Sequence, residues 1–286
     1  MLTVILTSCS STETSADQFD YIIEPLGVVI KSYLGKDSSV IVPEKIEGKN
    51  VIAIGDNTGL SYLDIVRYPA SARQPNGFTN RTDINSITIP KTVTEIRESA
   101  FAYTSINSIV LPKDIKKIGK YAFAASELES IELPLGLTEI DDFVFSACGK
   151  LKNIVIPNSI EEIGNSAFEY CGQLNKINLP NSLIRIDSYA FCRCSSLTEI
   201  VIPKSVTYIG WKAFSLCKSL KSITIPSSVK EIGINLYGAE QEKDVTNKDI
   251  IEAFFEGCNA LTEIRVYRNS YAEKFFANDP RLVIIN

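Results

Sequence analysis

Apolar and polar positions recur along most of this chain with a fixed period. Proline marks the period, because seven prolines follow one another at intervals of 22 or 23 residues. Each ends a segment close to L-x-x-I-x-[IL]-P, after which come a second apolar segment and then A-F-x-x-C. One unit therefore reads L-x-x-I-x-I-P-x-x-V-x-x-I-G-x-x-A-F-x-x-C-x-x. The prolines are Pro90, Pro112, Pro134, Pro157, Pro180, Pro203 and Pro226.

The pattern within one unit predicts three short elements. The alternation in I-x-I has the period of two typical of a β-strand, so we expect a strand of about four residues that the proline ends. The V-x-x-I segment predicts a second extended piece on another wall. The A-F-x-x-C segment predicts one turn of 3₁₀ or α-helix. Elements this short, repeated every 23 residues, indicate successive coils of a solenoid.

Energetics also require the units to stack. About seven apolar side chains per coil contribute on the order of 10–20 kcal/mol on burial. Ordering a coil of this length costs at least ~23 kcal/mol in backbone entropy. A single coil therefore cannot fold alone, whereas an array gains hydrogen bonds and a closed core between neighbouring coils.

The two ends and two internal stretches depart from the repeat. Alternating residues between glycine turns predict a β-hairpin cap near the N-terminus, and a helix followed by a strand is expected to close the C-terminal end. The predicted parts are a leader and tether at 1–18, a β cap at 19–55, a solenoid at 56–267 with a degenerate repeat at 56–83 and a helical insert at about 238–254, and a C-terminal cap at 268–286.

The unit resembles the leucine-rich repeats of the BspA-like (Treponema pallidum-type) family, whose repeats have the same framework of leucine, isoleucine, proline, glycine, phenylalanine and cysteine. The resemblance covers roughly residues 84–267. It implies a β-rich α/β solenoid, a right-handed and curved stack. The L-x-x-I-x-I strands would form a parallel sheet on its concave side, with short 3₁₀ or helical turns on the convex side.

The recurring cysteine, three residues after the phenylalanine, has three possible explanations. Metal binding usually needs C-x₂-C pairs or histidine, and the closest pair here is Cys192 and Cys194. Disulfides between coils need a geometry that a regular ladder does not supply freely. A buried wall is favoured, although Cys192 lies at a variable position and is expected to be partly exposed. The predicted ladders are Phe123, Phe145, Phe168, Phe191 and Phe214, and Cys148, Cys171, Cys194, Cys217 and Cys258.

Composition disfavours several classes of function. The 286 residues contain no histidine, so Ser-His and Cys-His catalytic pairs are excluded. No phosphate-binding, dinucleotide or calcium-loop motif is present, so no cofactor is expected. The acidic doublets Asp141–Asp142 and Glu161–Glu162 fall at polar positions of the convex side and are interpreted as solvated. The net charge of −5 without a basic block argues against nucleic acid.

With catalysis disfavoured, the remaining candidate for function is the extended surface of the predicted stack. Outward positions of the predicted strands form columns of small apolar, hydroxyl and charged side chains, which suit a protein or glycan partner, and we expect a monomer. The candidate binding residues are Glu132, Val155, Asn178, Val201, Thr224 and Arg265 in the middle column, and Lys176 and Glu199 in its neighbour.

The first residues suggest how the protein is attached to a membrane. The apolar run that ends in Leu6-Thr7-Ser8-Cys9 resembles the lipobox of bacterial lipoproteins, in which the cysteine is lipidated. The polar residues that follow are typical of a flexible tether. A signal peptide normally also has a basic start, and no lysine or arginine precedes Cys9. We expect a lipid anchor at Cys9 as the link to a membrane. The alternatives are a true start upstream of Met1 and an ordinary frayed terminus.

These observations favour a non-enzymatic repeat protein on the cell surface, as an outer-membrane lipoprotein or in secreted form. By resemblance alone, its role would be adhesion to host extracellular matrix or to other cells. The alternative is a periplasmic or secreted scaffold of the cell envelope that has no host partner.

Overall fold

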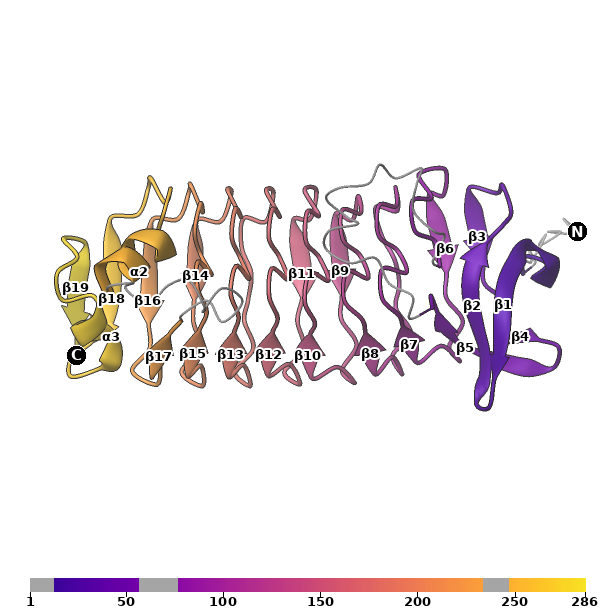
Figure 1. The fold of residues 1–286 in the computed structure, drawn as a ribbon, viewed down its shortest axis with the longest axis horizontal. Coiled ribbons are helices and arrows are strands. Elements are labelled where there is room, and N and C mark those ends of the chain that lie inside the picture. The colour runs from indigo at the N-terminus through magenta and orange to yellow at the C-terminus, as the bar shows by residue number, and fades with distance from the viewer. Residues whose placement is uncertain (1–12, 57–76, 234–246) are drawn as a thin grey trace, which may run out of the picture.

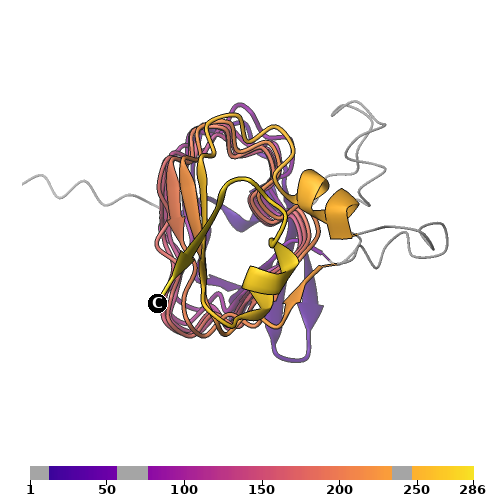
Figure 2. The same cartoon turned by 90° about the vertical axis from the view of Figure 1, so that its left-hand side faces the viewer.

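The repeating units fold as successive coils of one elongated stack, with β1 and β19 at its opposite ends (Figure 1). The computed structural model describes residues 13–56, 77–233 and 247–286. Viewed along the stack, the coils superpose as a single outline (Figure 2). The predicted leucine-rich repeat solenoid is therefore confirmed. Within these ranges, no helix combines the length and the apolar character needed to cross a bilayer.

The L-x-x-I-x-I segments form one wall of parallel strands, which we call the strand wall. Its side chains alternate as the pattern predicts: in β11, Asn153 and Val155 are exposed and Ile154 is buried. β3 pairs with β6, β9 pairs with β11, and β14, β16, β18 and β19 form one sheet. The strands are β3 (Ser39–Ile41), β6 (Ser86–Thr88), β9 (Ser130–Glu132), β11 (Asn153–Val155), β14 (Glu199–Val201), β16 (Ser222–Ile225), β18 (Glu263–Tyr267) and β19 (Leu282–Ile285).

The V-x-x-I segments form a second wall of parallel two-residue strands, which lies along the lower edge of Figure 1. Within each of two sheets, β7 with β8 and β10 through β17, a strand pairs with its equivalent 22 or 23 residues later, as Glu162 pairs with Arg185 and Arg185 with Tyr208. The strands are β7 (Glu95–Ile96), β8 (Lys117–Ile118), β10 (Glu139–Ile140), β12 (Glu162–Ile163), β13 (Arg185–Ile186), β15 (Tyr208–Ile209) and β17 (Glu231–Ile232).

The A-F-x-x-C segments form a third wall of turns. In one coil, the N–H groups of Ala167, Glu169 and Cys171 bond to carbonyls three residues earlier, which is the 3₁₀-type closure that the sequence predicts. The N–H groups of Ser166 and Tyr170 instead bond to carbonyls of the next coil, as does that of Phe168, so no continuous helix forms. Ser166 and Tyr170 adopt left-handed backbone angles, with φ of 51° and 62°.

A column of stacked phenylalanine rings fills the core. Phe168 is fully buried, and its ring centroid lies 5.4 Å from that of Phe145 and 5.3 Å from that of Phe191. The column continues through Phe78, within the predicted degenerate repeat, as far as Tyr33 in the N-terminal cap. One apolar core therefore runs through the whole stack.

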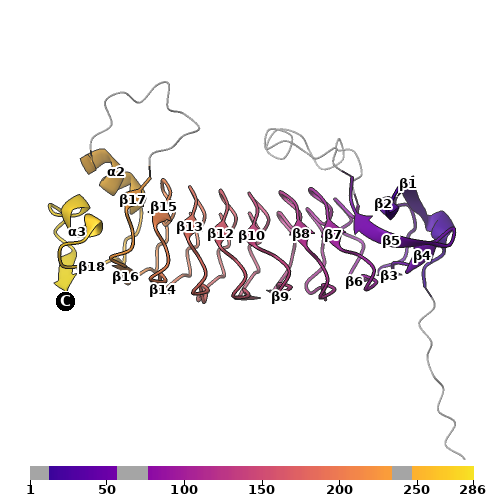
Figure 3. The same cartoon turned by 90° about the horizontal axis from the view of Figure 1, so that it is seen from below.

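The caps have the predicted kinds of element. At the N-terminal end, η1 (Ala16–Gln18) leads into the antiparallel hairpin of β1 (Phe19–Glu24) and β2 (Gly27–Tyr33), and β4 (Lys45–Ile46) and β5 (Lys49–Ile54) follow. At the other end, α3 (Tyr271–Phe275) precedes β19, and the Ser270 hydroxyl caps α3 by accepting a hydrogen bond from Glu273 N. α2 (Asn247–Phe254) lies on the side away from the strand wall (Figures 2 and 3). The strand wall is therefore left uncovered by helices of the described parts.

Candidate functional site

Outward side chains of the strand wall line up in two columns. Strand register places Glu132 beside Val155, and Val201 beside Thr224, which in turn lies beside Arg265. Glu199 of the neighbouring column lies beside Ser222. The predicted surface residues within the described strands therefore share one face of the molecule.

Three valines are prominent on this otherwise polar face. Val110, Val155 and Val201 occupy the middle column in alternate coils and are 85%, 57% and 73% exposed. A side chain with this exposure gains nothing from the core, whereas burying it against a partner would contribute about 1.5–3 kcal/mol when complete. Glu132 and Asn178 occupy the same column in the coils between them.

The strand wall is interrupted at residues 176–179, between β11 and β14. No strand forms there, and the backbone hydrogen bonds of the described residues include none from these four residues to a neighbouring coil. Asn178 stands where the coil before has Val155 and the coil after has Val201, and asparagine is disfavoured in strands relative to valine. The ladder of parallel strands is therefore broken between β11 and β14.

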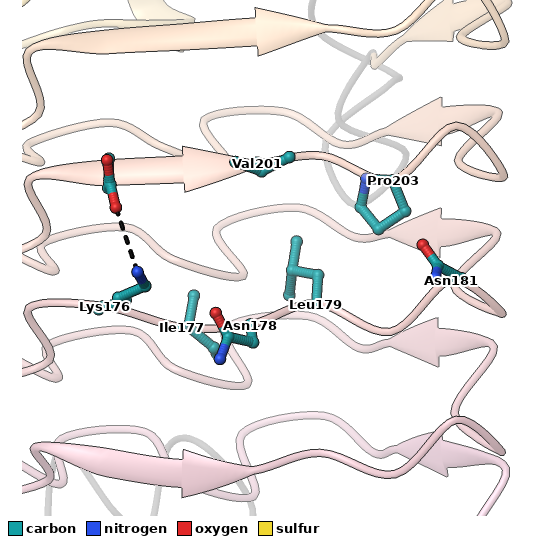
Figure 4. Close-up of a pocket in the computed structure, with 8 residues that line it drawn as sticks. Lys176, Ile177, Asn178, Leu179, Asn181, Val201 and Pro203 are labelled. Carbon is teal, nitrogen blue, oxygen red and sulfur yellow. Dashed lines mark ion pairs between the residues drawn. The ribbon is translucent and has the colours of Figure 1, made fainter.

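A hollow of about 190 Å³ lies at this interruption. Figure 4 shows that Lys176, Asn178 and Asn181 follow one another along one coil, while Val201 and Pro203 lie on the next. At one end, Lys176 Nζ forms an ion pair with Glu199 Oε1 at 3.4 Å. The lining residues are Lys176, Ile177, Asn178, Leu179, Asn181, Glu199, Val201 and Pro203.

The hollow brings together half of the predicted binding residues: Lys176, Asn178, Glu199 and Val201. Glu132 and Val155 lie on the strand wall before it, and Thr224 and Arg265 lie beyond β14. Cys9, the predicted lipidation site, lies outside the described residues. The sequence analysis missed four lining residues, because the repeat assigns their positions to the core or to the following turn: Ile177, Leu179, Asn181 and Pro203. The sequence did contain one sign of the interruption, because position 178 has an asparagine where the neighbouring coils have a β-branched valine.

The hollow presents groups suited to noncovalent contact. Its lining offers two side-chain amides, aliphatic surface and one ion pair, and backbone polar groups lie alongside. In the parts of the protein that the structure covers, no group of three or more cysteine or carboxylate side chains is arranged to hold a metal ion.

The cysteines of the turn wall form a buried column with a repeated contact. Each Sγ donates a hydrogen bond to the phenylalanine carbonyl of the preceding coil, as Cys194 does to Phe168 O at 3.2 Å. Burial raises the pKa of the Cys148 thiol to about 11, which keeps it protonated as a donor. These thiols are therefore bonded within the core, where they satisfy carbonyls between coils. The other pairs are Cys148 with Phe123 O, Cys171 with Phe145 O, Cys217 with Phe191 O and Cys258 with Phe214 O, at 3.0–3.2 Å.

The prediction that Cys192 is partly exposed is wrong. Its exposed fraction is 3%, and burial raises the pKa of its thiol to about 12. The alternation of a strand does not apply on the turn wall, so a variable position there need not point to solvent. Charged side chains flank Cys192, among them Glu169 and Lys212.

The acidic doublets are only partly solvated, which corrects the sequence-based interpretation. Asp142 accepts hydrogen bonds from Lys120 Nζ at 2.6 Å and from Asn165 N at 2.8 Å, so it links three coils. Burial, followed by a hydrogen bond and repulsion from Asp187, raises the pKa of Glu162 to about 6. Asp142 therefore helps to hold neighbouring coils together, whereas Glu162 faces repulsion from Asp187 of the next coil.

Comparison with known proteins supports the repeat assignment. The sequence model of the BspA type leucine rich repeat region, six copies long, matches residues 71–197, 116–242 and 186–285. Among proteins with curated descriptions, none matches this sequence.

Solved structures of other bacterial proteins are similar to this chain at low sequence identity. A leucine-rich repeat protein from Bacteroides ovatus is 23% identical, with a TM-score of 0.54 over 89% of this chain and 71% of its own. The leucine-rich repeat protein of T. pallidum is 24% identical, with a TM-score of 0.39 over 89% and 85% of the two proteins. A leucine rich cell surface protein from Faecalibacterium prausnitzii is 18% identical, with a TM-score of 0.44 over 93% and 97%.

Proposed function

The chain belongs to the BspA-type leucine-rich repeat family, and on that premise we propose that it is a non-enzymatic cell-surface protein that binds a protein or glycan partner through its strand wall. Adhesion to host extracellular matrix or to other cells is the role that the family resemblance implies for such a surface. The binding would involve many shallow contacts along the stack, because the wall is a sheet face and the hollow on it is small.

The observation that carries this proposal is the exposure of Val110, Val155 and Val201 on one uncovered wall. Isolated exposed apolar residues are common on soluble proteins and need no explanation. Here the three occupy one column in alternate coils, about 10 Å apart given the spacing of parallel strands. A partner lying along the stack could bury all three at once.

Replacing all three valines with lysine is expected to weaken binding to immobilised extracellular-matrix extract at least tenfold, about 1.4 kcal/mol or more. Lysine adds charge where the partner buries apolar surface. The matched control replaces the same valines with isoleucine, which keeps the β-branched, apolar character and should retain most of the binding. Half-saturating concentrations from a plate assay give the comparison.

Thermal unfolding of both triple variants should match the natural protein, because the replaced side chains lie outside the core. Binding that survives the lysine variant would remove the strand wall as the binding surface. Binding to cell-envelope extract in place of matrix extract would favour the scaffold function instead.

We also propose that Cys9 carries the lipid that anchors the protein. The support is the run Leu6-Thr7-Ser8-Cys9 followed by a polar, Ser/Thr-rich stretch. Cys9→Ser is expected to move the protein from the membrane fraction to the soluble fraction and to abolish labelling by a radioactive fatty acid. Ser10→Ala serves as the control and should leave both unchanged. Unaltered fractionation of Cys9→Ser would refute the anchor and leave the binding proposal intact.

A further inference from the structure

We infer that the free edge of β19 pairs with β19 of a second copy of this protein, so that two stacks join end to end. β19 lies at the C-terminal end of the strand wall (Figure 1), beyond the hollow and the three valines. The pairing itself is independent of the proposed function, whereas its use in joining two cells rests on that function. A dimer would replace the monomer that the sequence suggested.

β19 has a neighbouring strand on one side. It ends the sheet of β14, β16, β18 and β19, and it pairs with β18. Figure 2 looks at this end of the stack and shows β19 in front, with α3 to one side. The Arg281 carbonyl accepts a hydrogen bond from Ile264 N, and the Ile285 carbonyl accepts one from Arg268 N. Backbone groups alternate along a strand, so those of Ile284 point away from β18, where the described residues place no further strand.

The side chains of β19 are those of an interior strand. All four are aliphatic, and Ile284 lies beside Val266, which is fully buried in β18. Ile284 nevertheless has an exposed fraction of 43%, because none of the described coils covers it. Natural edge strands are usually protected by charged residues, prolines or bulges. β19 contains no charged residue or proline and pairs with β18 in unbroken register, so its edge is suited to pairing with another strand.

The opposite end of the strand wall is closed by the protein itself. The Ile41 carbonyl of β3 accepts a hydrogen bond from Thr14 N at 3.0 Å, and Ile41 N donates one to the Thr14 hydroxyl at 3.0 Å. These bonds lie on the side of β3 away from β6, so they block head-to-tail continuation of the wall through β3. The β19 edge of a second copy is open and identical, so the two edges can meet in a two-fold symmetric contact.

Antiparallel pairing centred on Ile284 suits both the backbone and the side chains. Ile284 N of each copy would donate a hydrogen bond to the Ile284 carbonyl of the other, as in the closely spaced pairs of antiparallel sheets. The two Ile284 side chains would then lie about 4.5–5.5 Å apart at Cβ and cover the open ends of both cores. Val283, which is 37% exposed, would lie opposite Ile285 of the other copy. The two strand walls would face the same side and form one longer surface.

A contact of this size is weak in solution. Four residues per copy are far fewer than the roughly 20–30 of a standard interface, so we expect a Kd between about 1 µM and 1 mM. The described chain begins at residue 13, at the other end of the stack (Figure 1). An end-to-end pair therefore places the two N-terminal ends far apart, as joining two cells requires. Many such pairs acting in parallel between facing surfaces would hold far more tightly than one.

Sedimentation equilibrium of the full chain with Cys9→Ser, which removes the proposed lipid, tests the pairing. We expect a reversible monomer–dimer equilibrium with a Kd at or below about 1 mM. Ile284→Glu places two carboxylates opposite each other and should raise this Kd at least tenfold. Ile184→Glu is the matched control, because Ile184 has a similar exposed fraction of 45% and lies far from β19, and it should change the Kd less than twofold.

A second measurement tests the register. Directly opposed residues of a hydrogen-bonded antiparallel pair have Cα atoms about 5.5 Å apart, which suits a disulfide. In the Cys9→Ser protein, Ile284→Cys should therefore form a disulfide-linked dimer under mild oxidation, whereas Ile184→Cys should stay monomeric.

The inference is overturned by a protein that stays monomeric at about 1 mM, by a dimer that Ile284→Glu leaves equally tight, or by Ile284→Cys that does not cross-link. Binding of Ile284→Glu to immobilised matrix extract should equal that of the natural protein. Loss of pairing alone therefore leaves the proposed function standing, and loss of matrix binding in the triple lysine variant leaves the pairing standing.

Discussion

Replacing Phe168 with alanine is expected to lower the free energy of unfolding by about 3–5 kcal/mol. Its ring is fully buried and stacks on the rings of Phe145 and Phe191 at 5.4 and 5.3 Å. Stacked aromatic pairs contribute about 0.5–1.5 kcal/mol each beyond their buried area. The substitution removes two such pairs and leaves a cavity in the middle of the column.

The position of Phe168 makes the loss larger than in a compact domain. A coil contacts only its two neighbours, so stability depends on each interface in the series, and a defect in a middle coil weakens two of them. Urea denaturation followed by circular dichroism measures the change. Tyr170→Ala is the control in the same coil, because Tyr170 is 48% exposed, and it should cost less than half as much. Equal losses in the two variants would mean that the column does not hold the stack together.

The sequence predicted the architecture well because the stack imposes one period on every coil. Residues 22 or 23 apart take equivalent places, so the pattern could align Glu162 with Arg185 and Val201 with Thr224, as their strand registers do. The left-handed angles at Ser166 and Tyr170 could not be predicted. Serine and tyrosine carry no preference for this conformation, and hydrogen bonds to the next coil impose it.

The candidate site was only partly predictable for a related reason. The columns followed from register, and they included Asn178 and Val201. The interruption of the strand wall at residues 176–179 depends on whether that coil pairs with both of its neighbours. The sequence of a single repeat does not contain this information. Asn181 joins the hollow because the backbone bends after Pro180, which is a property of the folded coil. Cys192 was misjudged because strand alternation was extended to a wall built of turns.

Gly210→Ala is expected to destabilise the protein by about 3 kcal/mol or more, at the upper end of the usual cost of overpacking. A Cβ atom at this position would lie 2.3 Å from Ser188 N and 2.5 Å from Asp187 C. Both are backbone atoms of the preceding coil, so rotation of a side chain would not make room. The two coils would have to separate, and the hydrogen bond from Gly210 N to Ile186 O at 2.8 Å would be strained with them.

Gly149→Ala is the matched control, because nothing lies within 4 Å of its added Cβ. This substitution restricts the unfolded chain, so it should raise the free energy of unfolding by less than about 1 kcal/mol. Urea midpoints of the two variants, measured side by side, separate close packing between coils from the general effect of losing a glycine. If Gly210→Ala were as stable as Gly149→Ala, the second wall would have room between its coils. The spacing of the stack would then be set by the phenylalanine column and the hydrogen bonds between coils, without close packing at this glycine.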